Sequence, residues 1–567
     1  MRRFDADNTR YGPQTVSLQR FLGGNMSHVI TRAKTPRRII TVLATGLAFA
    51  LIATACGGEV TDNADDVVVG SDPSTTTTTT AASTGEGATS TVPDEPSGPN
   101  IYEDPRGGIF ADFQAGYDRG DNPFSQIDSF CTSTESAPDR VDTDAGITAG
   151  TISIVHIRSR LEDAVEIGFG IPVGDPAHMF EVFVDYVNNQ CGGVRGRMID
   201  LTTIEVPLFG PTVETDRNAA CLEATEDHDA VIVVNSSGFQ GAATVCITEE
   251  KETIFISTQG QTEEFMQRAD GRLVSISLTL EESLRFSAQD LIAGGELEGK
   301  ILGVVTPDTP GQPEAVEAGL VVPLRDAGID VVFDQIGCGG STICVDGVTE
   351  SVANMKDSGI SAFFNAMGIL TAPGYINEMV NQGFEPGDVT FYASDFNSQA
   401  SELVSSQIPN EPAAGALYNG ATIRDFRGTG LYRNDGYAPT AWQDLCVGLY
   451  NDNNTIGANH QWQDQGGDSG FGMTVSVCSI MRIALRALYN AGDNPTRADV
   501  EAALSHLGPI DLGQMIPASI TPGKGQAPDA IETLDFSYPC DQPYPYAREN
   551  AEAVCITGRD DWRAAPR

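Results

Sequence analysis

The stretch AVIVVNSSGFQGAATVCITEEKETIFISTQG, residues 230–260, decides the fold of this chain. It contains two short apolar runs, AVIVV and TIFIS, which predict strands, and the segment GAATVCITEEK between them predicts a helix. Short apolar strands that alternate with helices are typical of parallel sheets covered on both faces. The polar turns NSSG and TQG follow the two runs directly. Because ligands bind beyond the carboxyl ends of such strands, these turns are candidate ligand loops.

The same alternation extends in both directions from this stretch. TISIVHI and MIDLTTIEV predict strands upstream, and ILGVV, IDVVF, SAFFN and VTFYA predict strands downstream, with helices between successive strands. A break near residues 262–298 separates two such blocks, and a third, helical region at 476–507 follows them. The sequence therefore predicts an α/β protein with two parallel sheets, each covered by helices.

A helix predicted over residues 175–190 leads into a distinctive turn. The segment DYVNNQCGGVRGRMIDL carries Asn188, the pair Gly192 and Gly193, and then Gly196 and Arg197 before the second strand. This order of pieces resembles the type I periplasmic binding proteins, the leucine/isoleucine/valine-binding branch of the ABC transporter receptors. The resemblance covers most of the chain, and it implies two lobes joined by three crossings, with a ligand bound in the cleft between them.

The two strand–helix blocks and the resemblance together suggest how the chain is divided. We expect lobe one to comprise residues 148–275 and 418–515, and lobe two to comprise residues 276–417 and 516–567. Each lobe is then discontinuous in sequence, as three crossings require.

The resemblance also implies which loops contact the ligand. In lobe one the matching positions are Ser236, Ser237, Ser257, Thr258 and Gln259. In lobe two they are Thr306, Asn365, Met367, Asp395 and Phe396. Family members that bind α-amino acids hold the carboxylate with lobe-one hydroxyls and amides, and the ammonium with a lobe-two acid at the position of Asp395. We therefore expect a small polar solute, such as an amino acid, an amide or a similar compound, with any carboxylate near helix N-termini.

Several of these residues also have a purely structural interpretation. Ser236 and Ser237 are good helix N-caps, and Asp395 could cap the turn in which it lies. Asn365 and Met367 end a predicted strand and could serve only in packing. Both interpretations stay open from the sequence alone.

Composition limits the classes of partner. The 567 residues include 78 acidic and 34 basic ones, for a net charge of −44. Such a chain repels nucleic acid and anionic lipid, because both are bound through clusters of Lys and Arg. We therefore expect no nucleic-acid partner.

The N-terminal region has the features of an export signal. A basic segment, RAKTPRR, precedes the uncharged apolar run Ile39–Ile52, and small residues separate this run from Cys56. The order resembles a bacterial lipoprotein signal, which implies that residues 1–55 are removed and that Cys56 carries the lipid anchor. The alternative is an uncleaved N-terminal membrane anchor. Either arrangement places the rest of the chain outside the cytoplasm, at the cell membrane, and residues 1–25 could be a misassigned start before Met26.

Two segments separate this signal from the α/β body. Residues 56–100 are rich in Thr, Ser, Pro and Gly, with little to bury, and predict a disordered linker. Residues 101–147 lack clear periodicity and are expected to form an irregular N-terminal extension that packs on the body.

The cysteine count is consistent with an oxidising compartment. Without Cys56, ten of the 11 cysteines remain, and no C-x-x-C pair occurs. Proximity along the chain favours four pairs, and elimination leaves the fifth. We expect Cys338–Cys344, Cys540–Cys555, Cys446–Cys478, Cys221–Cys246 and Cys131–Cys191.

No enzyme signature is convincing. GGDSGFG contains Ser469, but the nearby His460 lies in the same polar loop, and the surrounding pattern is not that of a serine protease. The sequence has neither a P-loop nor a G-x-S-x-G motif, and its six histidines are scattered. We expect no enzymatic activity, no cofactor and no metal site.

Two functional classes remain. The first is a lipid-anchored solute-binding protein that delivers a small solute to ABC permease subunits. The second is a ligand-sensing or adhesive surface lipoprotein of the same fold that has no transporter.

Overall fold

The computed structural model of the chain describes residues 130–131, 136–163, 173–239, 241–309, 311–339, 343–368, 370–395, 399–400, 402–434, 436–465, 470–513, 518–540, 554–559 and 561–564. All of them belong to one compact unit, Val92–Arg567. The expected signal peptide, Cys56, the linker and the extension up to residue 129 lie outside the described residues.

The first sheet consists of five parallel strands in the order β2-β1-β3-β4-β5. Neighbouring residues of a strand face opposite sides, so Ile154 and Val234 enter one apolar core while Val155 and Val233 enter another. Burial of both faces explains why the inner strands β3 and β4 are apolar at every position but the last. The strands are β1 (Thr151–Ser159), β2 (Met198–Val206), β3 (Ile232–Asn235), β4 (Ile254–Ser257) and β5 (Leu273–Ser275).

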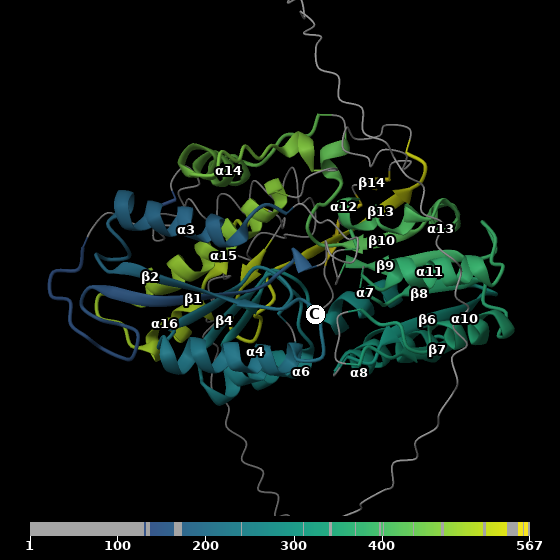
Figure 1. The fold of residues 1–567 in the computed structure, drawn as a ribbon, viewed down its shortest axis with the longest axis horizontal. Helices are drawn as coiled ribbons and strands as arrows, with labels where there is room; N and C mark the ends of the chain where they lie inside the picture. Colours follow the sequence, from purple (N-terminus) through teal and green to yellow (C-terminus); the bar gives the residue numbers. More distant parts are fainter. Residues whose placement is uncertain are drawn as a thin grey trace, which may run out of the picture. The chain divides into compact units, whose positions relative to one another are not determined.

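Helices cover both faces of this sheet (Figure 1). One face is packed by α3, α14, α15 and α16, and the other by α4, α5 and α6. The helices are α3 (Pro176–Tyr186), α4 (Val213–Leu222), α5 (Ala242–Val245), α6 (Glu263–Arg268), α14 (Ala441–Asn453), α15 (Gly470–Asn490) and α16 (Arg497–Leu504), and α3, α4 and α5 continue into the π-helical turns η2 (Val187–Cys191), η3 (Glu223–Asp227) and η4 (Cys246–Glu250).

Helix α15 is the longest of these helices. Among the described residues it is the one helix long and apolar enough to span a membrane, and 89% of that segment is buried inside the fold. Its side chains contribute to the same core as β1 and β3. Its apolar sequence is therefore explained by its place at the centre of lobe one.

The second sheet has the strand order β14-β13-β10-β9-β8-β6-β7, with β15 beside β13. Strands β6 to β9 are parallel, as expected, and β10 is added parallel beside β9, whereas β13, β14 and β15 are antiparallel. The strands are β6 (Ile301–Pro307), β7 (Asp330–Ile336), β8 (Ala362–Asn365), β9 (Thr390–Ser394), β10 (Thr422–Asp425), β13 (Ala530–Ser537), β14 (Cys555–Gly558) and β15 (Arg563–Ala564).

Helices again cover both faces of the second sheet. Helices α7, α8 and α9 share one core with Val304 and Phe364, and α10, α11 and α13 share the other with Val305 and Phe363. The helices are α7 (Leu280–Ala293), α8 (Gln312–Val316), α9 (Val322–Asp326), α10 (Val348–Asp357), α11 (Ala372–Asn381), α12 (Glu402–Ser405) and α13 (Pro412–Tyr418).

The lobe boundaries differ from expectation at two places. Residues 418–515 are expected in lobe one, but β10 pairs with β9 and β13 of the second sheet. With only four residues, TIRD, β10 has no apolar periodicity to mark it in the sequence. Residues 516–567 are expected in lobe two, but Ala518, Ile520 and Ala527 lie in the core of lobe one. The third crossing therefore comes just before β13.

The cysteine pairing is as expected. The structure contains the disulfides Cys131–Cys191, Cys221–Cys246, Cys338–Cys344, Cys446–Cys478 and Cys540–Cys555. The first of these ties the N-terminal extension to lobe one. Beside it, Phe130 stacks on Phe183 and Trp442, with ring centroids 5.2 and 6.0 Å apart. The end of the extension therefore packs on the body as expected.

The turn after α3 explains why its residue types occur together. The side chain of Asn188 accepts from the backbone N–H of Ile199 and donates to its carbonyl, at 2.8 and 2.9 Å. Gly193 has a φ of +78°, and a Cβ at this position would lie 2.1 Å from the carbonyl oxygen of Arg197. Asn188 and Gly193 therefore connect the helix to β2, and this motif belongs to the architecture rather than to a ligand site.

Candidate functional site

The five lobe-one residues expected at the site lie together where β3 and β4 end. Asn235 and Ser257 are paired in the sheet, so the turns that follow the two strands are neighbours. The Thr258 hydroxyl donates to the carbonyl of Ser236 at 2.9 Å, and the backbone N–H of Gln259 donates to Ser257 Oγ at 3.0 Å. These bonds join the two turns into one polar surface at the carboxyl edge of the sheet.

A histidine that the sequence analysis did not single out lies beneath this surface. Nε2 of His156, on β1, is 2.8 Å from Ser236 Oγ, and its ring centroid is 4.3 Å from that of Phe180. Burial, assisted by the nearby charge of Arg158, lowers the pKa of His156 to about 3. The ring is therefore neutral and orients the Ser236 hydroxyl. Its signal in the sequence is a single polar residue inside the apolar run TISIVHI.

Two polar atoms of this surface are buried without a partner in the described part of the chain. They are the Ser237 hydroxyl oxygen and Oε1 of Gln259. A buried polar atom that makes no hydrogen bond costs about 1–3 kcal/mol, so each such atom requires a physical explanation. Their place at the ends of two neighbouring parallel strands is where a ligand is expected.

The lobe-two residues at the ends of β6 and β8 are occupied by internal contacts. Asn365 donates to Oε1 of Gln399 at 3.1 Å and accepts from the backbone N–H of Met367 at 3.1 Å. Met367 is fully buried in an apolar core, and Thr306 is fully buried as well. The packing interpretation therefore fits Asn365 and Met367 as the structure has them. Phe396 lies outside the described residues.

Asp395 is paired within the protein, whereas the predicted ligand-binding acid would be free. Its Oδ2 lies 3.5 Å from Nε of Arg427, and its Oδ1 accepts from the backbone N–H of Ala400 at 2.8 Å. Asp425, at the end of the adjacent strand β10, interacts with it as a second buried acid. Burial raises the pKa of both carboxyls, and the charge of Asp395 raises that of Asp425 further. The acid pair therefore retains a proton more readily than a solvated pair would, with Arg427 as its cation.

Arg427 connects this acid pair to the lobe-one surface. Its Nη2 donates to the Ser277 hydroxyl at 2.9 Å, and that hydroxyl donates to the carbonyl of Thr258 at 2.8 Å. Ser277 lies in the first crossing between the lobes, and Arg427 lies just after β10 at the start of the second. Asp425 and Arg427 were missed because the segment containing β10 was assigned to lobe one.

The N-terminus of α6 is not available for an anionic ligand. The backbone N–H of Glu263 donates to Oε2 of Glu281 at 2.9 Å, and Thr262 caps the same helix through its hydroxyl. Burial raises the pKa of Glu281 to about 7, and Glu263 adds to this shift, while backbone hydrogen bonds and Arg285 oppose it. A side chain of the protein therefore occupies this particular helix end.

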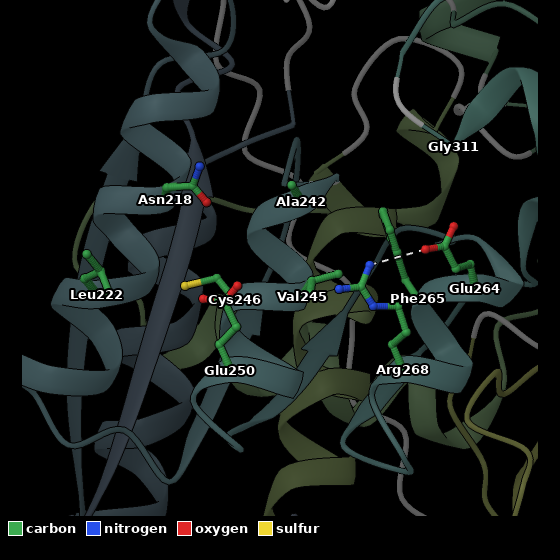
Figure 2. Close-up of a pocket in the computed structure, with 10 residues that line it drawn as sticks. All are labelled: Asn218, Leu222, Ala242, Val245, Cys246, Glu250, Glu264, Phe265, Arg268 and Gly311. Carbon is green, nitrogen blue, oxygen red and sulfur yellow. Dashed lines mark hydrogen bonds and ion pairs between the residues drawn. The ribbon is translucent and has the colours of Figure 1, made fainter. Parts of the chain in front are cut away.

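A hollow of about 590 Å³ lies elsewhere in the fold (Figure 2). Helices α4, α5 and α6 and the turn η4 line it, and Figure 2 shows Arg268 paired with Glu264 at one side. None of the nine described residues that are expected to contact the ligand lines this hollow. It is therefore separate from the polar surface at the ends of β3 and β4.

With the geometry described, the fold can be compared with known proteins. No family model and no curated protein matches the sequence. The structure of a solute-binding protein of an ABC transporter from Rhodopseudomonas palustris BisB5, in complex with 3,4-dihydroxybenzoic acid, has a TM-score of 0.51 and 13% identity, over 74% of this chain and 98% of that one. An R. palustris solute-binding protein in complex with 4-hydroxybenzoate has a TM-score of 0.51 and 14% identity, over 73% and 98%. A fatty acid ABC transporter substrate-binding protein from Thermomonospora curvata has a TM-score of 0.52 and 17% identity, over 76% and 96%.

These neighbours define the class of fold. The chain has the two-lobed fold of the type I periplasmic solute-binding proteins of ABC transporters, as the residues around the Asn188 turn suggested. The proteins compared are binding proteins rather than enzymes.

Proposed function

We propose that this protein is an extracytoplasmic, lipid-anchored solute-binding protein that captures a small solute between its lobes for an ABC importer. The observation that carries this proposal is a pair of buried atoms, Ser237 Oγ and Gln259 Oε1, that make no hydrogen bond among the described residues and lie at the carboxyl ends of neighbouring strands. A bound solute would supply their missing hydrogen bonds. The fold supports the same assignment.

The proposed solute is small and polar and carries a carboxylate. Two of the structural neighbours are complexes with hydroxylated benzoic acids, and the third belongs to a fatty acid transporter. Amino acids belong to this class as well, and amides and similar neutral compounds are the alternative without a carboxylate. Because a charge buried without a partner is too costly, the site must pair each charge of the solute it encloses.

A thermal-shift screen of the full chain tests the proposal. The panel contains amino acids, amides, urea, small sugars and small aromatic and aliphatic carboxylic acids. A ligand that binds only the folded state raises the melting temperature by mass action. A shift with any member supports a solute-binding function, and silence across the panel at millimolar concentration contradicts it. Permease and ATPase genes beside this gene would support an importer over a surface sensor.

The variants Ser237→Ala and Gln259→Ala should weaken binding of the solute that the screen finds. Each removes one hydrogen bond to the solute, for an expected loss of about 1 kcal/mol, or roughly five-fold in Kd. Stability of the free protein should stay nearly unchanged, because neither atom has a partner among the described residues. Calorimetry measures the affinity, and Ser505→Ala, on a partly exposed position after α16, is the control. Unchanged affinity in both variants would remove these two turns from the site.

The variant Cys56→Ser tests the anchor. If Cys56 carries a lipid, the wild-type protein fractionates with membranes and the variant does not. Mass spectrometry of the native N-terminus provides the second readout. An unmodified N-terminus upstream of Cys56 would show an uncleaved membrane anchor instead.

A further inference from the structure

The Arg427 side chain lies where the two lobes are joined. It follows β10 directly, and its hydrogen bond to Ser277 links the second crossing to the first. Through the Ser277 hydroxyl it is one residue away from Thr258 and the lobe-one surface. Its side chain is 20% exposed, whereas that of Asp395 beside it is 2% exposed. Of the charged side chains in this cluster, Arg427 is therefore more exposed than Asp395, and a solute meets it first.

Most N–H donors of this guanidinium make no hydrogen bond to the residues that the structure describes. A guanidinium has five N–H donors, and within the described residues only Nη2 of Arg427 donates a hydrogen bond, to Ser277. Nε is buried, lies 3.5 Å from Asp395 and makes no hydrogen bond in the described part of the chain. The fork of an arginine matches a carboxylate in geometry, so these open donors suit an acidic group.

The two buried acids beside Arg427 hold its guanidinium in place without using all of its N–H donors. Asp395 and Asp425 are both almost fully buried and lie at the ends of adjacent strands. Asp425 also accepts from the backbone N–H of Thr429 at 2.8 Å, which fixes its carboxylate toward the start of the second crossing. Neither acid is exposed enough to meet an ammonium group of a solute.

The surroundings provide few alternatives for an anion. The N-terminus of α6 is occupied by Glu281, and the chain carries a net charge of −44. An anionic solute therefore approaches an acidic protein and needs a local cation at the site. Arg427 is such a cation, next to the turns that hold the unpartnered Ser237 and Gln259 atoms.

We propose that Arg427 binds the carboxylate of the solute, and that the solute is a monocarboxylate without an ammonium group. This inference rests on the proposed function and narrows it. Ser277 orients the guanidinium, and the lobe-one turns bind the neutral part of the solute. Asp395 serves as the internal partner of Arg427 instead of as a receptor for an amino group.

Matched pairs of probes test the proposal by calorimetry on the full chain. The first pair is 4-hydroxybenzoate and 4-hydroxybenzamide, and the second is 4-methylpentanoate and leucine. We expect at least one of the two acids to bind, and the other member of its pair to bind roughly 30-fold more weakly or worse. The benzamide lacks the carboxylate that pairs with Arg427, and leucine adds an ammonium group that would be buried without a partner. Arg427→Gln should weaken the acid roughly 30-fold and leave the amide nearly unchanged.

The control is Arg272→Gln. Arg272 has a similar exposure, 18%, and one ion pair, to Glu501 at 3.0 Å, but it precedes β5 at the opposite end of the first sheet. The Arg272→Gln variant should bind the acid as tightly as the wild type. Since Arg427→Gln leaves two buried acids without their cation, the variant Arg427→Gln/Asp425→Asn preserves the charge balance and should show the same loss of affinity.

Three results would overturn the proposal. The first is that Arg427→Gln and the double variant bind the acid as tightly as the wild type. The second is that leucine binds more tightly than 4-methylpentanoate. The third is that neither acid binds at millimolar concentration. If a neutral solute from the thermal-shift panel binds while both acids fail, the solute-binding function stands and the role of Arg427 falls. If nothing in that panel binds, both fall.

Discussion

The variant Arg197→Met is expected to lower the free energy of unfolding by roughly 3–5 kcal/mol. Arg197 is 1% exposed, and its guanidinium donates to the carbonyls of Thr148 and Asp493 and to Oδ1 of Asn494, at 2.8, 2.5 and 2.8 Å. It also donates to the carbonyl of Val141 at 3.2 Å. One side chain thus joins the extension, β2 and the segment between α15 and α16. Methionine fills a similar volume but leaves all four acceptors without this donor.

Urea denaturation of the full chain with its disulfides intact measures this effect. The control is Arg268→Met, which removes two ion pairs from a side chain that is 42% exposed. Exposed pairs contribute about 0–1 kcal/mol, so the control should change stability little. A loss of less than about 1 kcal/mol in Arg197→Met would mean that water replaces the guanidinium at each acceptor.

The Arg197 motif illustrates what the sequence can predict. The spacing of Asn188, Gly193 and Arg197 indicated a fold, and the structure shows that each residue serves the connection from α3 to β2. Local backbone geometry of this kind is dictated by neighbouring residues, and it can be recognised from a short motif. The apolar strands were predictable for the same reason, since burial on both faces leaves a continuous apolar run.

The boundaries of the lobes were less predictable. Strand β10 has only four residues, and two of them, Arg424 and Asp425, are charged. Arg424 is buried because it pairs with Asp290 at 2.7 Å, and that partner is distant in the sequence. No local pattern can show that such a residue belongs to a buried strand. Because β10 was assigned to the wrong lobe, Asp425 and Arg427 were not recognised as neighbours of Asp395.

The candidate site, too, was predictable only in part. The turns after β3 and β4 were located correctly on the carboxyl edge of the sheet, because strand order and chain direction determine that edge. The partners of individual side chains were not predictable. His156 beneath Ser236 lies on another strand, and Arg427 beside Asp395 follows another strand, 80 and 32 residues away along the chain. The sequence indicated an acid at Asp395, and the structure shows that the accessible charge beside it is positive.

The variant Glu281→Gln is expected to remove a pH-dependent loss of stability of roughly 2–3 kcal/mol between about pH 5 and pH 8. Glu281 is 7% exposed at the start of α7, and its carboxylate accepts from the backbone N–H of Glu263 at 2.9 Å. Its pKa is raised from 4.5 to about 7, mainly by burial. Over this window the folded protein holds a proton that the unfolded chain has released, so stability falls as the pH rises. Glutamine keeps an acceptor for Glu263 and carries no charge, so the variant should gain stability relative to the wild type as the pH rises.

Urea denaturation of both proteins at the two pH values tests this expectation. The other 77 acidic residues also change stability with pH, but they are common to both proteins and cancel in the difference between them. The control is Glu264→Gln on α6, whose side chain is 63% exposed and whose charge remains in water. Its difference from the wild type should be small at both pH values. A Glu281→Gln difference that is the same at pH 5 and pH 8 would mean that the carboxylate is charged in the folded protein throughout. In that case the positive charge of Arg285, which pairs with Glu263 at 2.7 Å, would offset the cost of burying the charged Glu281 carboxylate. This pair lies where α6 of lobe one meets α7 of lobe two.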